Sequence, residues 1–236
     1  MSTFVIVPGA WDTPSTMEPV IEPLGSAGHE VIVVDLPCGN PDATLGEYAD
    51  AVRAVLPDDL AEVVLVGYSF GGFTASKIAL EHPDVPVVYV AAWIPRDGSS
   101  VLDLFVGGDP FEAGEEAGIA AFDGLILSAG QGLCALNIDR YVAAADPGER
   151  DSVRTYLERT QRPQGINALR EKWRGGLPVS RRRTYVLTTA DTLVPPETQR
   201  VMATSVGADV VEINTDHGIF REQPVRLAEL LVAASH

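Results

Sequence analysis

One serine lies between two glycines at a point where the sequence changes from strand-like to helix-like. The segment Gly67-Tyr68-Ser69-Phe70-Gly71 follows the apolar run Val63–Val66 and precedes Ala75 and Ile78, which are spaced as on one face of a helix. A reversal this tight leaves little room for Cβ atoms beside the turn and strains the serine. The pattern predicts that Ser69 is a nucleophile, with the N–H groups of the helix start facing a developing oxyanion. The alternative is a glycine-rich turn without chemistry.

A serine hydroxyl needs a base to take its proton near neutral pH, and the sequence offers four histidines. His29 and His82 lie at predicted helix ends and His236 is the last residue, so each has a structural explanation. His217 instead follows the last predicted strand. Because the carboxyl ends of parallel strands meet at one edge of a sheet, we expect His217 beside Ser69.

The base in turn needs a carboxylate that orients it. Asp191 directly follows the predicted strand Thr184–Thr188 and is our preferred candidate. Asp97, beyond the preceding strand, is the rival, and either aspartate could instead be a turn residue. Asp216 adjoins His217, but adjacent residues on an extended loop rarely face each other. The expected chain order is serine, aspartate, histidine.

Short apolar runs that alternate with amphipathic helical patterns surround these residues. Alternation of this kind predicts a parallel sheet built from βαβ units. Capping boxes at Ser15–Glu18 and Thr44–Glu47 predict two helix starts, and Pro23 is expected to kink or shorten the first helix. The predicted strands are Phe4–Val7, Val31–Val34, Val63–Val66, Val87–Val90, Thr184–Thr188 and Val210–Ile213.

The alternation stops in the middle of the chain. A chain of 236 residues suits one domain, and we expect a core of residues 1–94 and 184–236. Residues 95–183 have glycine-rich loops and short helical patterns, so we expect a mostly helical cap there. Long insertions in compact domains commonly cover a ligand site.

Composition restricts the partners. Seventeen basic and 33 acidic residues give a net charge of −16, which disfavours nucleic acids and anionic membrane surfaces. No signal peptide or membrane span is recognisable, and Cys38 and Cys134 are interpreted as reduced thiols, so we expect a cytoplasmic protein. No pattern of metal ligands is present in the sequence. The expected partner is a small molecule with an apolar part, and the oligomeric state stays open.

The chain order Ser69, Asp191, His217, together with the turn Gly67–Gly71, resembles the α/β-hydrolase superfamily. The resemblance covers nearly the whole chain. Four segments are more closely similar to small esterases related to plant methyl esterases and hydroxynitrile lyases. The resemblance implies a doubly wound, mostly parallel six-stranded sheet with a helical cap, and no cofactor. It also implies a triad of Ser69, Asp191 and His217, and an oxyanion hole formed by the backbone N–H groups of Ala10 and Phe70. The four segments are Val5–Trp11, Val33–Pro37, Gly67–Gly72 and Asp216-His217.

Two positions depart from the family pattern. Pro8 replaces a histidine that is mostly structural in the family, and we expect the loop shape to survive. Gly218 occupies the place where the lyases carry a lysine, which argues against cyanohydrin chemistry.

The sequence therefore predicts a serine hydrolase that cleaves a small ester, thioester or lactone through an acyl-enzyme. Two alternatives stay open, a lyase or decarboxylating enzyme with the same triad, and a ligand-binding receptor on this scaffold. Aromatic residues that follow strands or lie in the cap are candidates for an apolar pocket or for the cap core. These candidates are Trp11, Trp93, Phe105, Phe111 and Trp173.

Overall fold

The computed structural model describes residues 1–177, 180 and 182–235, so His236 lies outside the described residues. Its centre is a sheet of six parallel strands in the order β2-β1-β3-β4-β8-β9. This sheet confirms the predicted doubly wound α/β architecture. The strands are β1 (Thr3–Val7), β2 (Glu30–Val33), β3 (Val63–Tyr68), β4 (Val87–Val90), β8 (Arg183–Thr188) and β9 (Asp209–Ile213).

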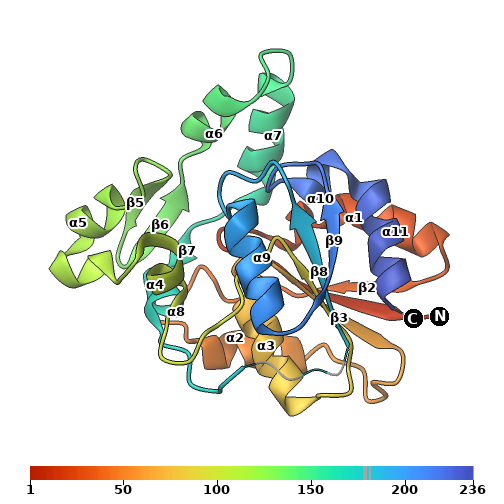
Figure 1. Cartoon of the computed structure of the whole chain (residues 1–236). Helices are drawn as coiled ribbons and strands as arrows, with labels where there is room; N and C mark the ends of the chain where they lie inside the picture. Colours follow the sequence, from red (N-terminus) through yellow and green to blue (C-terminus); the bar gives the residue numbers. More distant parts are fainter. Residues whose placement is uncertain (178–179, 181, 236) are drawn as a thin grey trace.

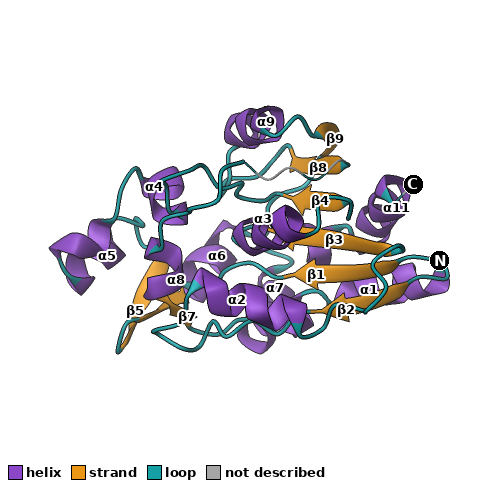
Figure 2. Ribbon diagram, turned by 90° about the horizontal axis from the view of Figure 1, so that it is seen from below, coloured by secondary structure: helices purple, strands orange, loops and turns teal. Residues whose placement is uncertain are grey.

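Helices cover both faces of the sheet (Figure 2). The central strands β1, β3 and β4 are buried at every residue, as expected for strands covered on both sides. One face packs against α2 (Leu45–Arg53), α3 (Gly71–Glu81) and α9 (Pro196–Ser205). The other face packs against α1 (Glu18–Ser26), α10 (Ile219–Glu222) and α11 (Pro224–Ala234).

The two predicted helix starts differ in outcome. Thr44 forms the expected capping box with Glu47 at the start of α2. The expected box at Ser15 does not form, because residues 14–16 adopt a 3-10 turn and α1 begins only at Glu18. Pro23 does not end α1, which continues to Ser26. Pro23 lacks the backbone N–H that would donate to the Pro19 carbonyl in the first turn of this short helix, so one hydrogen bond is lost.

The segment between β4 and β8 forms a layer over the carboxyl ends of the strands, toward which the arrowheads of the sheet point (Figures 1 and 2). It includes an antiparallel sheet in the order β5-β6-β7, which the sequence analysis does not predict. Its elements are α4 (Val101–Val106), a 3-10 turn (Pro110–Ala113), α5 (Glu115–Ala120), β5 (Ile126–Gly130), β6 (Leu133–Leu136), α6 (Ile138–Ala144), α7 (Arg150–Thr160), β7 (Gln164–Gly165) and α8 (Ile166–Arg170). Across the described part of the chain, the helices are too short or too polar to cross a membrane.

Candidate active site

Ser69 lies at the apex of the turn between β3 and α3. Its φ of 50° is left-handed, which is strained for a residue other than glycine. The turn presses against the end of β1, where a Cβ at Gly71 would lie 2.3 Å from the carbonyl oxygens of Val7 and Pro8. Glycine at this position therefore allows the serine turn to sit against the first strand.

A continuous chain of hydrogen bonds joins Ser69, His217 and Asp191. The distance from His217 Nε2 to Ser69 Oγ is 3.0 Å, and the distance from His217 Nδ1 to Asp191 Oδ2 is 2.8 Å. His217 follows β9 and Asp191 follows β8, so the parallel sheet brings both to the edge that holds Ser69. With Nδ1–H donating to the carboxylate, Nε2 is the acceptor for the serine proton.

The Asp191 carboxylate is held as an anion. Its Oδ1 accepts the backbone N–H groups of Leu193 and Val194 at 2.9 and 2.8 Å, and its Oδ2 accepts the Thr188 hydroxyl at 2.8 Å. Burial by itself raises the pKa of Asp191, but His217 and these hydrogen bonds outweigh burial and lower the pKa below its usual value. The Asp191 carboxylate in turn outweighs the burial of His217 and raises the pKa of the imidazole.

Neither Asp97 nor Asp216 forms a hydrogen bond with the imidazole. Asp97 is exposed and lies outside the cavity described below. Asp216 lines that cavity, but its Oδ1 accepts the Gly218 N–H at 2.7 Å. Of the three candidates, Asp191 is therefore the one placed to orient His217.

Two backbone N–H groups near Ser69 donate no hydrogen bond among the described residues. Ala10 lies in the loop after β1, and Phe70 directly follows Ser69. Within the described part of the chain, no acceptor takes a hydrogen bond from either backbone N–H. The two residues also line the same cavity as Ser69. Both amides are thus available to an incoming oxygen atom.

A cavity of about 610 Å³ lies between the sheet edge and the cap, with Ser69 and His217 in its wall. Trp11 and Trp93 from the core and Phe105 from the cap line it, as the sequence analysis expects. Phe105 also makes an edge contact with Trp93. Further apolar lining comes from Val101, Leu102, Phe122, Leu125, Leu136, Tyr141, Val153, Tyr156, Leu157, Leu193, Val194 and Phe220.

Trp173 does not line the cavity, which corrects the expectation from sequence. Its ring is 3% exposed and stands edge-on to Phe73, and its indole N–H donates to the Gly176 carbonyl at 2.7 Å. Phe111 also lies outside the cavity and packs on Phe122. Both aromatic side chains are core residues, because burial of their large area does not require a ligand site.

Comparison with known proteins gives the family. Residues 4–230 match the sequence profile described as "Alpha/beta hydrolase family". The chain belongs to this family. The hydrolase is 26% identical over 249 aligned residues to a "Carbendazim hydrolyzing esterase" of Nocardioides sp. (strain SG-4G), with 99% of both chains covered. These matches support ester hydrolysis as the type of reaction.

Solved structures share the fold of this hydrolase over the whole chain. An extracellular alpha/beta-hydrolase from a Paenibacillus species has a TM-score of 0.78 and 24% identity, with 99% of each chain covered. Polyneuridine aldehyde esterase has a TM-score of 0.76 and 24% identity, with 100% of each chain covered. A methylesterase from Arabidopsis has a TM-score of 0.72 and 19% identity, with 99% of this chain and 98% of that chain covered. The predicted resemblance to small esterases and plant methylesterases is thereby confirmed for the fold.

Several residues that shape the site of this hydrolase were not singled out from the sequence. The Tyr68 hydroxyl donates to the His217 carbonyl at 2.8 Å, and its ring lies 5.1 Å from the imidazole. The Gln199 side chain, on α9, donates to Asp191 Oδ2 at 3.2 Å and to the Val194 carbonyl at 2.6 Å. Tyr68 could have been identified from the sequence only by its position inside the motif Gly67–Gly71. Nothing in the sequence indicates the role of Gln199.

Asp12 is a further buried carboxyl in the cavity wall that the sequence analysis missed. Burial raises its pKa to about 6. Its neighbour in sequence, Trp11, has a left-handed φ of 65°, so the loop of residues 8–12 is strained at its tip. Backbone strain in this loop, next to the strained Ser69, marks the loop as part of the candidate site.

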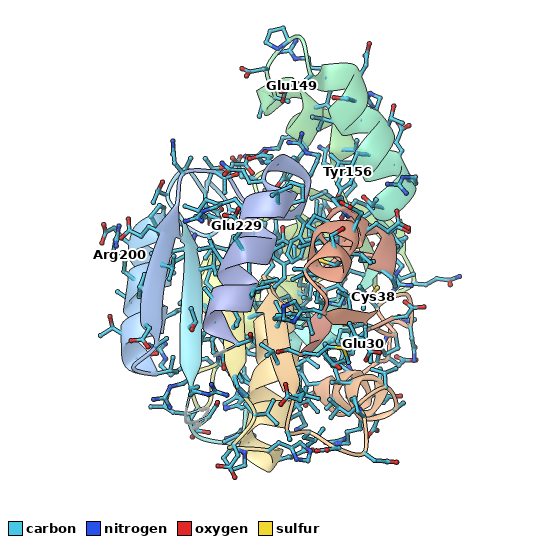
Figure 3. The ribbon with its side chains drawn as sticks, turned by 90° about the vertical axis from the view of Figure 1, so that its right-hand side faces the viewer. Glu30, Cys38, Glu149, Tyr156, Arg200 and Glu229 are labelled. Atoms are coloured by element: carbon cyan, nitrogen blue, oxygen red, sulfur yellow. The ribbon has the colours of Figure 1, made fainter. Side chains whose placement is uncertain are left out.

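The charged residues of the cavity wall are mainly acidic. The two arginines of the wall, Arg140 and Arg221, are paired with Asp123 and Glu222. Glu149 marks the outer end of α7 and Tyr156 the part of α7 nearer the core (Figure 3). Around the hydrolase cavity, negative charge therefore exceeds positive charge. The acidic lining residues are Asp12, Asp146, Glu149, Asp216 and Glu222. No group of three or more potential metal ligands is found among the residues that the structure describes.

Proposed function

We propose that this hydrolase cleaves a small carboxylic ester through a serine-bound acyl intermediate. The observation that carries the proposal is the chain of hydrogen bonds from Asp191 through His217 to Ser69, because Ser69 and His217 line a largely apolar cavity. A serine, a base within reach and a carboxylate that orients the base are together the arrangement that activates a hydroxyl. Thioesters and lactones contain the same reactive carbonyl and remain substrates to test.

In the proposed reaction, Ser69 Oγ forms a bond to the ester carbonyl carbon while its proton passes to His217 Nε2. The N–H groups of Ala10 and Phe70 donate to the carbonyl oxygen as it becomes an oxyanion. The carbonyl re-forms, the bond to the alkoxy group breaks, and His217 returns the proton to the leaving alcohol. A water molecule that His217 activates then cleaves the acyl-serine bond and releases the acid. Asp191 stabilises the imidazolium in both steps and stays ionised.

Two other functions were considered from the sequence. The glycine at position 218, in place of a lysine, argues against a cyanohydrin lyase. A receptor that only binds its ligand would have no need of a serine in a strained conformation with a base 3.0 Å away. Both observations favour hydrolysis.

The test is covalent labelling of Ser69 together with turnover. We expect an aryl phosphonate to modify the peptide that contains Ser69, as detected by mass spectrometry, and to abolish hydrolysis of p-nitrophenyl acetate. Ser69→Ala should be neither labelled nor active above the solvent rate. Wild type, Ser69→Ala and His217→Ala with equal slow rates would instead support the receptor. Carbendazim and a pyrethroid are added to the substrates tested, because one relative is named a carbendazim-hydrolysing esterase and one solved structure with the same fold is named a pyrethroid hydrolase.

A further inference from the structure

The Asp12 side chain joins the loop of residues 8–12 to the cap. Its Oδ2 accepts the Gly9 N–H at 3.0 Å, and its Oδ1 accepts the Gln161 side-chain N–H at 2.8 Å. A Cβ at Gly9 would lie 2.8 Å from Asp12 Oδ2 and 2.9 Å from Ser69 Cβ. The carboxyl group therefore reaches into the narrow space between this loop and the serine turn.

The chain that leaves α7 runs alongside the same loop. The Thr13 N–H donates to the Thr160 carbonyl at 2.9 Å, and the Arg162 N–H donates to the Trp11 carbonyl at 2.7 Å. These bonds form an isolated antiparallel bridge between Asp12 and Gln161. The two backbone bonds fix the outer side of the loop, but neither reaches Gly9. The Asp12 carboxyl is the group that links the bridge to Gly9, one residue before Ala10.

We propose that Asp12 is a positioning residue that, held by Gln161, fixes the loop of residues 8–12 so that the Ala10 N–H points to the oxyanion. This inference rests on the proposed serine-esterase function. Oxyanion donors are effective only within a few tenths of an ångström of their required position. A loop with a left-handed tryptophan at its tip needs an internal hydrogen bond to keep that shape.

The role of Asp12 is as a hydrogen-bond acceptor and not as a charge. No arginine or lysine forms an ion pair with it among the described residues. A full negative charge this close to Ser69 would oppose the developing oxyanion. Burial raises the pKa of Asp12 to about 6, so the carboxyl is partly neutral near pH 6 and ionised above pH 8, and its oxygens accept the Gly9 and Gln161 N–H groups. The titratable groups that face it are His217, Tyr68, Tyr141, Tyr156 and Cys38, of which only His217 becomes positively charged.

Asparagine is the informative replacement. Its side-chain oxygen can still accept the Gly9 N–H, and the Gln161 amide can turn so that its oxygen accepts from the new NH₂ group. We expect Asp12→Asn to keep kcat within about threefold of wild type above pH 8. Because the variant removes a negative neighbour that raises the pKa of His217, the acid limb of its kcat/KM profile should move to lower pH.

Substitutions that remove the hydrogen bonds of Asp12 test its link between Gly9 and Gln161. With p-nitrophenyl acetate, Asp12→Ala should lower kcat about 10- to 100-fold with KM changed less than about threefold, because an oxyanion donor is displaced but not removed. The affinity for a trifluoromethyl ketone, which forms a tetrahedral adduct, should fall by the same factor. Gln161→Leu should lower kcat less, and adding it to Asp12→Ala should have no further effect. The matched control is Glu18→Gln, which removes the ion pair of Glu18 with Arg159 on α7 without contact to the loop.

The outcomes separate this inference from the proposed function. An Asp12→Ala protein that folds by circular dichroism and keeps wild-type kcat overturns the positioning role. A raised KM with unchanged kcat also overturns it, since Asp12 would then bind substrate. If Asp12→Asn has a kcat as low as that of Asp12→Ala, the negative charge of Asp12 is what matters, and the inference is likewise refuted. If Ser69→Ala is as active as wild type, the proposed esterase mechanism itself has failed.

Discussion

Replacing Asp191 by asparagine should invert the hydrogen-bond pattern around His217. Asp191 Oδ1 accepts two backbone N–H groups, so the amide oxygen of the asparagine must take that position. The NH₂ group then replaces Oδ2, which lies 2.8 Å from His217 Nδ1. Two donors would face each other unless the imidazole carries its proton on Nε2. In that tautomer Nε2 donates to Ser69 Oγ and cannot accept the serine proton.

The expected loss follows from the wrong tautomer. An acid-to-amide change in a serine triad lowers kcat by about 10⁴, which corresponds to about 5.5 kcal/mol of transition-state stabilisation. The new NH₂ group also lacks an acceptor in Gln199, because Gln199 Nε2 donates to Oδ2 in the wild type and would face the NH₂ group in the variant. The fold should persist, because the two backbone bonds to Oδ1 remain.

Steady-state hydrolysis of p-nitrophenyl acetate by purified variants is the assay, with circular dichroism and thermal unfolding as checks of the fold. The matched control is Asp97→Asn, an identical change at an exposed position. We expect it to change kcat by less than about tenfold. If Asp191→Asn keeps more than about a tenth of wild-type kcat while folded, or if Asp97→Asn is the more damaging change, the argument from hydrogen-bond geometry is refuted.

Three further outcomes follow from the charges of the site. The base must be neutral, and since Asp191 raises the pKa of His217, kcat/KM should fall with acidification already above the ordinary histidine value of 6.5, as a pH profile will show. Asp12 has a folded-state pKa raised from 3.8 to about 6, so the stability that its neutral form gives is complete below pH 3.8 and lost as the pH rises through 6. The free energy of unfolding of Asp12→Asn, measured relative to wild type by urea titration, should therefore rise by up to about 3 kcal/mol between pH 4 and pH 8. A difference that stays constant over this range contradicts the raised pKa. The acidic residues of the cavity wall should make kcat/KM for a monosuccinate ester at least about tenfold lower than kcat/KM for the butyrate ester, and high salt should reduce this difference. Equal values of kcat/KM would show that these residues do not contact the acyl chain.

The sequence by itself determined the sheet and the three residues most suited to chemistry. Apolar runs of strand length and the serine turn were sufficient for this, because periodicity and turn sterics are local properties. His217 and Asp191 could be placed near Ser69 because parallel strands bring their carboxyl ends to one edge. The structure places the His217 imidazole within hydrogen-bonding distance of both Ser69 and Asp191.

Tertiary structure alone decided which groups complete the site. Asp12 and Gln161 are 149 residues apart in sequence, and their contact depends on how the cap returns to the core. Trp173 and Phe105 are both large aromatic residues of the segment between β4 and β8, yet of the two only Phe105 lines the cavity. The small sheet of the cap likewise pairs short strands that carry weak local signals. Long-range packing sets these features, because a side chain's role depends on which distant segment covers it.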